Sequence, residues 1–286
     1  MATLRDLRQR KQSVLTSKKM TSAMKMVAAA KMRQFQKRFE LASSHLESIE
    51  QALAVTANTM DPASWPSVTR PRKASPSDVL WIVVGADRGF CGSFNTQILR
   101  AFDAAQDDET QAMVMTIGDK MGPLFEKTDL QVVSKQSMEN KPAFSKAQDI
   151  LAVATTLFQA GQVQEVVILS TRFKNVMRQD VVAQTLFPFP LETIAAPLKH
   201  QRQPLVYCEP TPTLLCESLT RFAMEATVMK ALLESCLSEQ GSRMTAMDSA
   251  TRNSEDILAK LDLTYNRKRQ SLITNELIEV ISGANL

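Results

Sequence analysis

The loop at residues 85–95 holds the residue types that could most readily do chemistry, because glycines after a buried strand can bring backbone N–H groups to a phosphate. Its glycines are Gly85, Gly89 and Gly92. This spacing matches neither the dinucleotide fingerprint nor the phosphate-loop pattern, and Gly-Lys followed by Ser or Thr occurs nowhere in the chain. The loop is therefore predicted to be a close-packed turn, and a bound nucleotide is the less favoured alternative.

No other pattern predicts a catalytic or metal site. The Ser, His and Asp residues show no nucleophile arrangement, and the acidic pair Glu255–Asp256 falls in a helical stretch without a neighbouring apolar pocket, which is typical of solvated charge. The cysteines lack CxxC spacing and lie far in sequence from both histidines, so a zinc site is not expected and buried reduced thiols are favoured. The residues concerned are Cys91, Cys208, Cys216, Cys236, His45 and His200. We predict no catalytic residue, no metal site and no cofactor.

The elements around the glycine loop have the pattern of an α/β domain, with bounds of about 77–210. Continuous apolar runs of strand length alternate with helical stretches, which is typical of a mainly parallel sheet. Strands are expected at residues 79–84, 112–117, 130–133 and 165–170, with helices through about 105 and at 144–160. Residues 171–193 are expected to form extended edge strands, and the proline-containing stretch 61–76 is expected to be an exposed connector.

Two long helices are expected at the ends of the chain, as domains 1–60 and 211–286. Residues 1–58 contain neither Gly nor Pro, and residues 213–283 contain no Pro and two glycines, Gly241 and Gly283. The apolar positions from Leu215 through Phe222 to Cys236 alternate in steps of four and three, which indicates a coiled-coil seam. The first helix carries a stripe that includes Met20, Met24 and Val27. We expect the two helices to form an antiparallel coiled coil along their length, because an apolar stripe is not stable when exposed to water.

The first helix is strongly basic. Residues 1–38 carry eleven Lys or Arg against the single acid Asp6, and the cations are Arg5, Arg8, Arg10, Lys11, Lys18, Lys19, Lys25, Lys31, Arg33, Lys37 and Arg38. Three explanations remain open: an organelle transit peptide, an arm that binds nucleic acid, or a helix matched to acidic protein surfaces. No apolar run is long enough to span a bilayer.

Four segments closely resemble the gamma subunit of F-type ATP synthases, in order, in spacing and in their placement near the ends. They are residues 24–32 (MKMVAAAKM), 87–92 (DRGFCG), 239–253 (EQGSRMTAMDSATRN) and 263–284 (LTYNRKRQSLITNELIEVISGA). The resemblance implies a coiled coil plus a Rossmann-like α/β domain. It also implies the central rotor shaft of the complex, which couples proton-driven rotation of the c-ring to conformational change in the beta catalytic sites. A coiled-coil protein that binds nucleic acid is the alternative.

The same resemblance implies partners, location and contact residues. The chain would do no bond chemistry, would be present once per complex, and would contact the alpha3beta3 hexamer, the epsilon subunit and the c-ring. It would lie peripherally on the cytoplasmic face of a bacterial inner membrane, or on the matrix side if organellar. Contacts with the hexamer are implied for Met24, Lys25, Arg269, Gln270, Thr274 and Glu276; contacts near the c-ring for Tyr207 and Glu209; and a structural glycine loop for Asp87, Arg88, Gly89 and Gly92. Residues 15–21 depart from the family pattern, so contacts there are expected to differ.

Overall fold

The computed structural model describes residues 3–71, 79–106, 112–126, 130–138, 142–196 and 207–283. The chain divides into two compact units. Unit 1 consists of Met1–Ala29 and Arg243–Leu286, and unit 2 consists of Ala30–Ser242. Both units contain part of the first and part of the last helix, so the boundaries between units fall inside these helices rather than at their ends.

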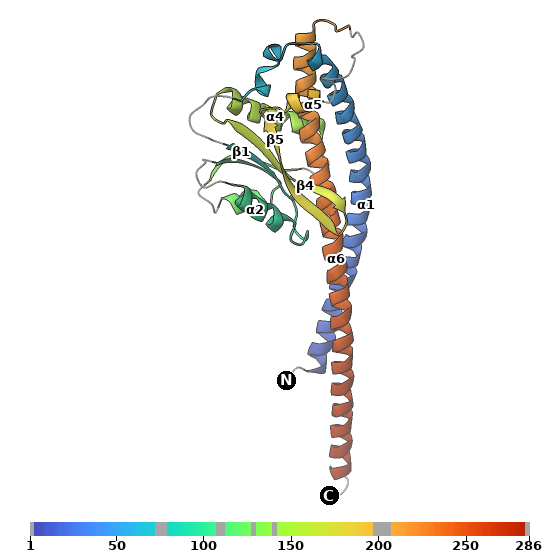
Figure 1. The fold of residues 1–286 in the computed structure, drawn as a ribbon. Helices are drawn as coiled ribbons and strands as arrows, with labels where there is room; N and C mark the ends of the chain where they lie inside the picture. Colours follow the sequence, from blue (N-terminus) through green and yellow to red (C-terminus); the bar gives the residue numbers. More distant parts are fainter. Residues whose placement is uncertain are drawn as a thin grey trace. The chain divides into compact units, whose positions relative to one another are not determined.

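The two predicted long helices are present (Figure 1). Helix α1 spans Leu4–Asn58 and helix α6 spans Pro212–Gly283. The start of α1 is fixed by a reciprocal cap, in which the Asp6 backbone N–H donates to Thr3 Oγ1 (3.2 Å) and the Thr3 backbone N–H donates to Asp6 Oδ2 (2.9 Å). This cap defines the first turn of the helix, because it satisfies backbone N–H groups that have no partner within the helix.

The connector after α1 is mostly exposed in its described part, as predicted, but it is folded rather than a plain loop. Its described part, through residue 71, forms two short 3-10 helices, Pro62–Ser64 and Ser67–Thr69. Trp65 Nε1 donates to the Ala57 carbonyl (3.2 Å), and the Phe189 backbone N–H donates to the Val68 carbonyl (2.9 Å). Trp65 and Val68 are partly buried against the core, so the connector packs onto unit 2 because its apolar side chains find partners there.

Unit 2 contains a five-stranded sheet in the order β3-β2-β1-β4-β5, parallel except for the pairing of β4 with β5. The strands are β1 (Val79–Val84), β2 (Ala112–Ile117), β3 (Gln131–Gln136), β4 (Glu165–Asn175) and β5 (Arg178–Phe187). The shorter helices are α2 (Phe94–Ala105), α3 (Gly122–Phe125), α4 (Phe144–Gln159) and α5 (Leu191–Ala195). This arrangement confirms the predicted mainly parallel α/β domain. Helix α5 and the full lengths of β3 and β4 were not predicted.

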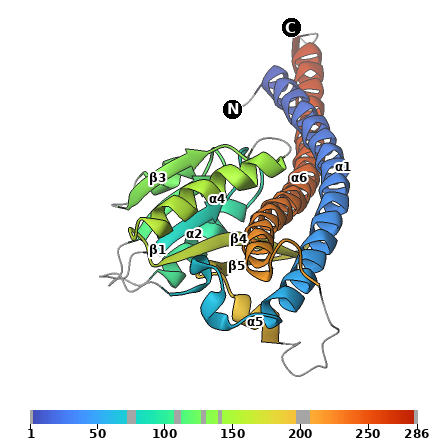
Figure 2. The same cartoon turned by 90° about the horizontal axis from the view of Figure 1, so that it is seen from above.

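The two faces of the sheet carry separate cores, and Figure 2 shows α2 and α4 on opposite sides of it. Alternating residues of β1 belong to different cores: Leu80 and Ile82 pack with α4, α1 and α6, whereas Trp81 and Val83 pack with α2 and α3. A strand buried on both faces needs apolar side chains at every position. This explains why β1 is a continuous apolar run rather than an alternating one.

Within unit 2, α6 has no single seam. Its residues from Ala223 to Leu233 are nearly all buried, while Phe222, a predicted seam residue, is 43% exposed. The prediction for Phe222 is wrong because α6 packs against α1 on one side and against the sheet on another. A helix that packs against two partners buries a wider part of its surface than the narrow apolar stripe of a two-helix coiled coil.

Candidate functional site

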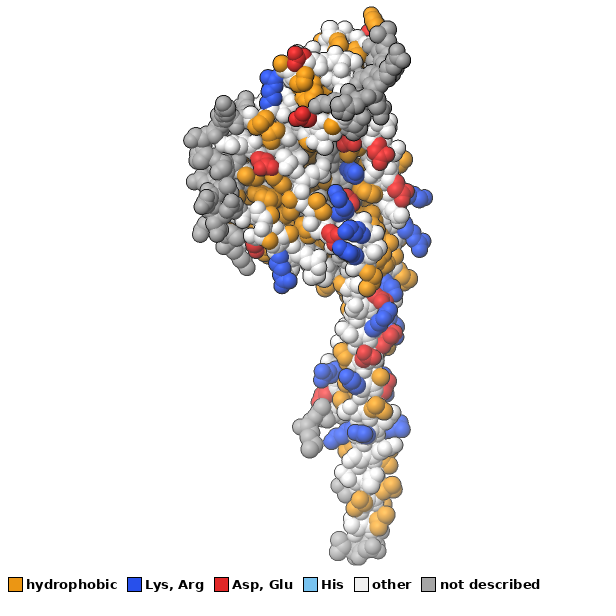
Figure 3. Space-filling view, in the orientation of Figure 1, with side chains coloured by type: hydrophobic (Ala, Val, Ile, Leu, Met, Phe, Trp, Pro, Cys, Tyr) orange, Lys and Arg blue, Asp and Glu red, His pale blue; other side chains and the backbone are white. Residues whose placement is uncertain are grey.

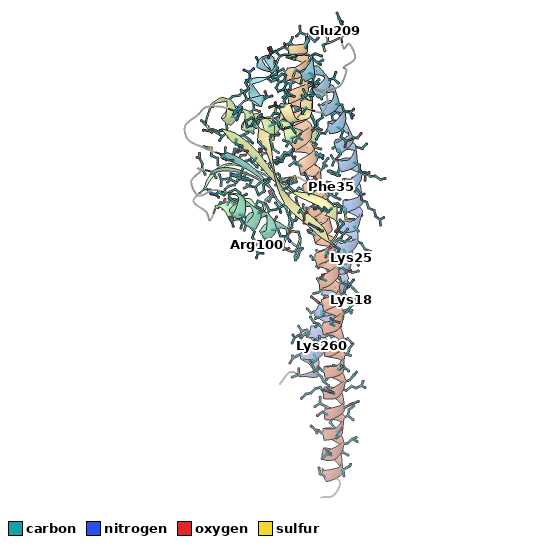
Figure 4. All side chains as sticks on the ribbon, viewed as in Figure 1. Lys18, Lys25, Phe35, Arg100, Glu209 and Lys260 are labelled. Carbon is teal, nitrogen blue, oxygen red and sulfur yellow. The ribbon has the colours of Figure 1, made fainter. Side chains whose placement is uncertain are left out.

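Unit 1 is an antiparallel helix pair whose register is marked by three ion pairs. Lys11 Nζ lies 2.6 Å from Asp262 Oδ1, Lys18 Nζ lies 2.9 Å from Glu255 Oε1, and Lys25 Nζ lies 2.5 Å from Asp248 Oδ1. Each step of seven residues along α1 is matched by a step of seven residues back along α6. We call these six residues the ion-pair ladder; Lys18 and Lys25 are labelled in Figure 4. A strict seven-residue repeat keeps the same faces of two supercoiled helices together.

Lys25, one of the residues implied to contact the hexamer, therefore has a partner within the chain. Asp248 also accepts from Arg252, at 2.9 Å between Nη2 and Oδ2. The hydrogen bond from Lys25 holds the pKa of Asp248 below its ordinary value, with a further contribution from the charge of Arg252. A lowered carboxyl pKa contributes stability that is lost as the pH falls through the folded-state value. The ladder is therefore expected to weaken in acid.

The predicted stripe of α1 is only partly correct. Met24 is half-buried, but Met20 and Val27 are 57% and 56% exposed, and Met26 is 65% exposed. The predictions for Met20 and Val27 are wrong because the ladder positions Lys18 and Lys25 fix which face of α1 points to α6. The exposed apolar side chains lie on the remaining surface of a helix that is rich in Lys and Arg.

The end of α6 extends beyond α1. Since Lys11 pairs with Asp262, the same register places Leu4, the first residue of α1, opposite Arg269. Residues of α6 after this point have no partner from α1, as Figure 1 shows. The expectation of a partner helix along the whole length is therefore wrong for this segment. We call Arg269–Gly283 the free end of α6.

The free end carries four of the predicted contact residues together with exposed apolar side chains. Arg269, Gln270, Thr274 and Glu276 are all exposed, and Thr274 Oγ1 donates to the Gln270 carbonyl (2.9 Å). Five large apolar side chains here are 48–69% exposed, namely Ile273, Leu277, Ile278, Val280 and Ile281. Hydrophobic side chains are visible on this segment in Figure 3. Such a cluster on a single helix is typical of a surface that another protein covers.

Tyr207 and Glu209 lie immediately before α6, and Figure 4 labels Glu209 at that end of the helix. Tyr207 is 87% exposed and Glu209 is exposed. The residues directly before Tyr207, from 197 to 206, lie outside the described part of the chain, as does His200. The implied c-ring contacts of Tyr207 and Glu209 remain predictions.

The glycine loop is closed by its own hydrogen bonds. Asp87 Oδ1 accepts from the backbone N–H of Met138 (2.8 Å) and of Asp119 (3.2 Å), and Asn95 Oδ1 accepts from the backbone N–H of Ala86 (3.0 Å). Asp87 thereby joins the loop after β1 to the segments after β2 and β3. These contacts support the close-packed turn, because side chains of the chain itself fix the loop to the neighbouring segments and occupy the backbone N–H of Ala86.

The glycines of this region have unequal roles. Gly92 has a φ of 60°, which favours glycine, whereas a Cβ at Gly89 would meet open space. Sequence analysis missed Gly118, which has a φ of 106° and where a Cβ would lie 2.6 Å from the Gly85 carbonyl oxygen. Its position directly after a buried strand was the available signal. Arg88 is exposed, and Phe90 is 70% exposed with a φ of 64°.

The described residues contain neither a metal-binding cluster nor a helix able to span a membrane. No group of three or more His, Cys, Asp or Glu side chains is placed to hold a metal ion within that part of the chain. No described helix is apolar and long enough to cross a membrane. None of the four cysteines forms a disulfide, and three of them, Cys91, Cys216 and Cys236, are buried, as predicted.

A charge reversal in the ladder tests its register. Lys18→Glu is expected to destabilise the helix pair of unit 1 by about 1 kcal/mol, because it removes one exposed ion pair and places two carboxylates together. Lys18→Glu combined with Glu255→Lys is expected to restore most of that loss. Unfolding in urea, followed by far-ultraviolet circular dichroism, measures the stability of each variant.

Tryptophan fluorescence provides the control, since both tryptophans, Trp65 and Trp81, lie in unit 2. The fluorescence transition is expected to stay unchanged in Lys18→Glu, in Glu255→Lys and in the double variant. A double variant as unstable as the sum of the two single variants would contradict the pairing of Lys18 with Glu255.

Comparison with known proteins identifies the family. The family model described as ATP synthase matches residues 3–285. The chain is 35% identical over 300 residues to the ATP synthase gamma chain of Chloroherpeton thalassium, covering 100% of this chain and 98% of that protein. It is 36% identical over 297 residues to the ATP synthase gamma chain of Paramagnetospirillum magneticum, covering 99% of each.

Solved structures agree on the fold. A chain of the Euglena gracilis mitochondrial ATP synthase (OSCP/F1/c-ring, rotational state 3) matches with a TM-score of 0.70 and 20% identity, covering 99% of this chain and 93% of that chain. A chain of the Tetrahymena thermophila mitochondrial ATP synthase central stalk and c-ring matches with a TM-score of 0.58 and 25% identity, covering 81% and 99%. These relatives give no support to the nucleic-acid alternative. Two long helices, a mainly parallel sheet and full-length similarity show that the chain belongs to the ATP synthase gamma chain family.

Proposed function

We propose that this chain is the central rotor shaft of an F-type ATP synthase, coupling proton-driven rotation of a c-ring to conformational change in the catalytic sites of the surrounding subunits. The chain itself is non-catalytic in this proposal. The observation that carries it is the free end of α6, where exposed apolar residues extend past the capped start of α1. A surface of this kind is stable in water only when another protein covers it.

The partners follow from the two ends of the helices. The free end of α6 fits the bearing formed by an alpha3beta3 hexamer, with Arg269 suited to a carboxylate because a guanidinium can donate two parallel hydrogen bonds. Tyr207 and Glu209, exposed at the start of α6, fit contacts near the c-ring, with an epsilon subunit bound to unit 2. One copy of the chain serves one complex, peripherally on the cytoplasmic face of a bacterial inner membrane, or the matrix face in an organelle.

The mechanism requires a shaft that differs from side to side. A single asymmetric helix pair within a threefold ring gives each catalytic subunit different contacts, and differential contacts shift each subunit between its conformations. Contacts that form and break at each step must be modest in strength. Exposed side chains such as Arg269 and Glu276 meet this requirement, because ion pairs at a protein surface are worth little and exchange readily.

Purification from the native host tests the proposal. We would tag the chain, solubilise membranes in mild detergent, and measure ATP hydrolysis and subunit masses in the purified material. The expected result is an ATPase in which two partner subunits are each present in threefold excess over this chain. Recovery of the chain alone, or with nucleic acid, would overturn the rotor proposal.

A further inference from the structure

A small charged cavity lies inside unit 2, where α1, α6 and the sheet meet. Its volume is about 250 Å³. Each of these three elements supplies charged side chains to its lining: Glu50 from α1, Arg172 from β4, and Lys230 and Glu234 from α6. The remaining lining is a mixture of apolar and uncharged polar side chains. The side chains of Glu50 and Glu234 are partly buried in this site, so they lose part of their hydration and their ionisation is penalised.

Glu234 has a raised pKa, because the effect of burial outweighs that of its partners. The partners that act against burial are the Phe173 backbone N–H, which donates a hydrogen bond, and the charges of Arg172 and Lys230. The hydrogen bond, 3.1 Å long to Glu234 Oε1, ties α6 to β4. Glu234 therefore serves as a structural link between the helix and the sheet.

Glu50 has weaker support for its charge. Burial raises its pKa, the charge of Lys230 lowers it, and the charge of Glu47 raises it again. Lys230 is shared with Glu234, so Glu50 has no cation of its own among the groups that act on it. The lining itself is balanced, with the carboxyls of Glu50 and Glu234 beside the cations Arg172 and Lys230, because Glu47 is exposed and lies outside the lining. Both cations act on Glu234, whereas only Lys230 acts on Glu50, so Glu50 is the carboxyl whose charge has the least support.

We propose that this cavity is a proton-binding site in which Glu50 takes up the proton, and that proton uptake strengthens the packing of α1 against α6 and the sheet. A protonated Glu50 stays in the cavity as a neutral group that needs no counter-ion. The inference does not depend on the rotor proposal, because every residue involved lies within unit 2.

The direction of the pH dependence follows from the raised pKa. The folded chain binds the proton at Glu50 more tightly than the unfolded chain does, so stability increases with proton uptake. This contribution is fully present below the ordinary glutamate pKa and is lost as the pH rises through the higher folded-state value. Asp248 in unit 1 responds in the opposite direction, since its pKa is lowered. Acid is therefore expected to stabilise the cavity and to weaken the ion-pair ladder.

The first test measures proton binding directly. Carboxyl carbon-13 resonances of the glutamates would be followed by NMR in the full-length chain across a pH titration, with Glu50→Gln used to assign the Glu50 signal. Glu40, an exposed residue of the same helix, is the internal reference. The midpoint for Glu50 is expected to lie above that for Glu40. Coincident midpoints would overturn the proposal.

The second test measures the effect on packing. Glu50→Gln mimics the protonated state, so it is expected to raise the unfolding midpoint of unit 2, detected by tryptophan fluorescence, at about pH 8 and to have little effect at about pH 5. The matched variant Glu40→Gln is expected to cause no pH-dependent shift. A shift in Glu50→Gln of equal size at both pH values, or a lowered midpoint at about pH 8, would contradict the proposed role.

Discussion

Deletion of residues 269–286 is expected to leave unit 2 folded and to reduce ATP-driven proton pumping by roughly tenfold or more in complexes carrying the shortened chain. The deleted segment contains all five exposed apolar side chains of the free end and the four predicted contact residues Arg269, Gln270, Thr274 and Glu276. A tenfold loss corresponds to about 1.4 kcal/mol of lost interaction with the partner. Burying only one or two of these apolar side chains would supply that amount.

Two measurements separate coupling from folding. Tryptophan fluorescence reports unit 2 through Trp65 and Trp81, and its unfolding transition is expected to match that of the full-length chain. Pumping would be measured in membrane vesicles, beside ATP hydrolysis and the amount of assembled complex. Full pumping by the shortened chain would refute the role of the free end.

A substitution control distinguishes the apolar surface from the polar contacts. Arg269→Ala together with Gln270→Ala leaves the five apolar side chains in place. If the polar pair makes the main contact, this variant should lose most of the pumping that the deletion loses. If the apolar surface is the main contact, the variant should assemble and pump nearly normally. Both residues are exposed, so the substitutions are expected to leave the helix intact.

The buried strands and the long helices could be predicted from the sequence because each has a local cause. The apolar run 79–84 and the strand 112–117 match β1 and β2 residue for residue, since strands buried on both faces leave a continuous signal. The absence of proline from 213 to 283 matches α6 within one residue of its start. In these segments, the residues themselves decide the structure.

Packing that depends on a second partner could not be predicted. Phe222 fits a coiled-coil step but is exposed, because the sheet covers α6 on a face that the periodicity does not describe. The extent of the free end depends on the register of the ion-pair ladder, which brings together residues more than 200 positions apart in the chain. The cavity around Glu50 combines side chains from four elements, α1, β4, β5 and α6, none of which marks a site when taken alone.

Asp87 is the glycine-loop residue whose replacement is expected to have the largest effect. Asp87→Ala should destabilise unit 2 by about 2–3 kcal/mol, because the backbone N–H groups of Met138 and Asp119 lose their acceptor. Most of the loss comes from Met138, which is 2% exposed, since a buried donor cannot turn to water. Asp119 is exposed, so its N–H group can bind water instead.

Urea unfolding followed by tryptophan fluorescence measures this loss, because Trp81 lies in the strand that leads into the loop. Asp87→Asn keeps one acceptor oxygen and is expected to lose only about 1 kcal/mol. Asp103→Ala, at an exposed position of α2, is the matched control and should change stability by less than about 0.5 kcal/mol. Equal losses for Asp87→Ala and Asp103→Ala would show that the link between β1 and β3 contributes nothing, and that the loop is held by the close approach of Gly118 to Gly85 instead.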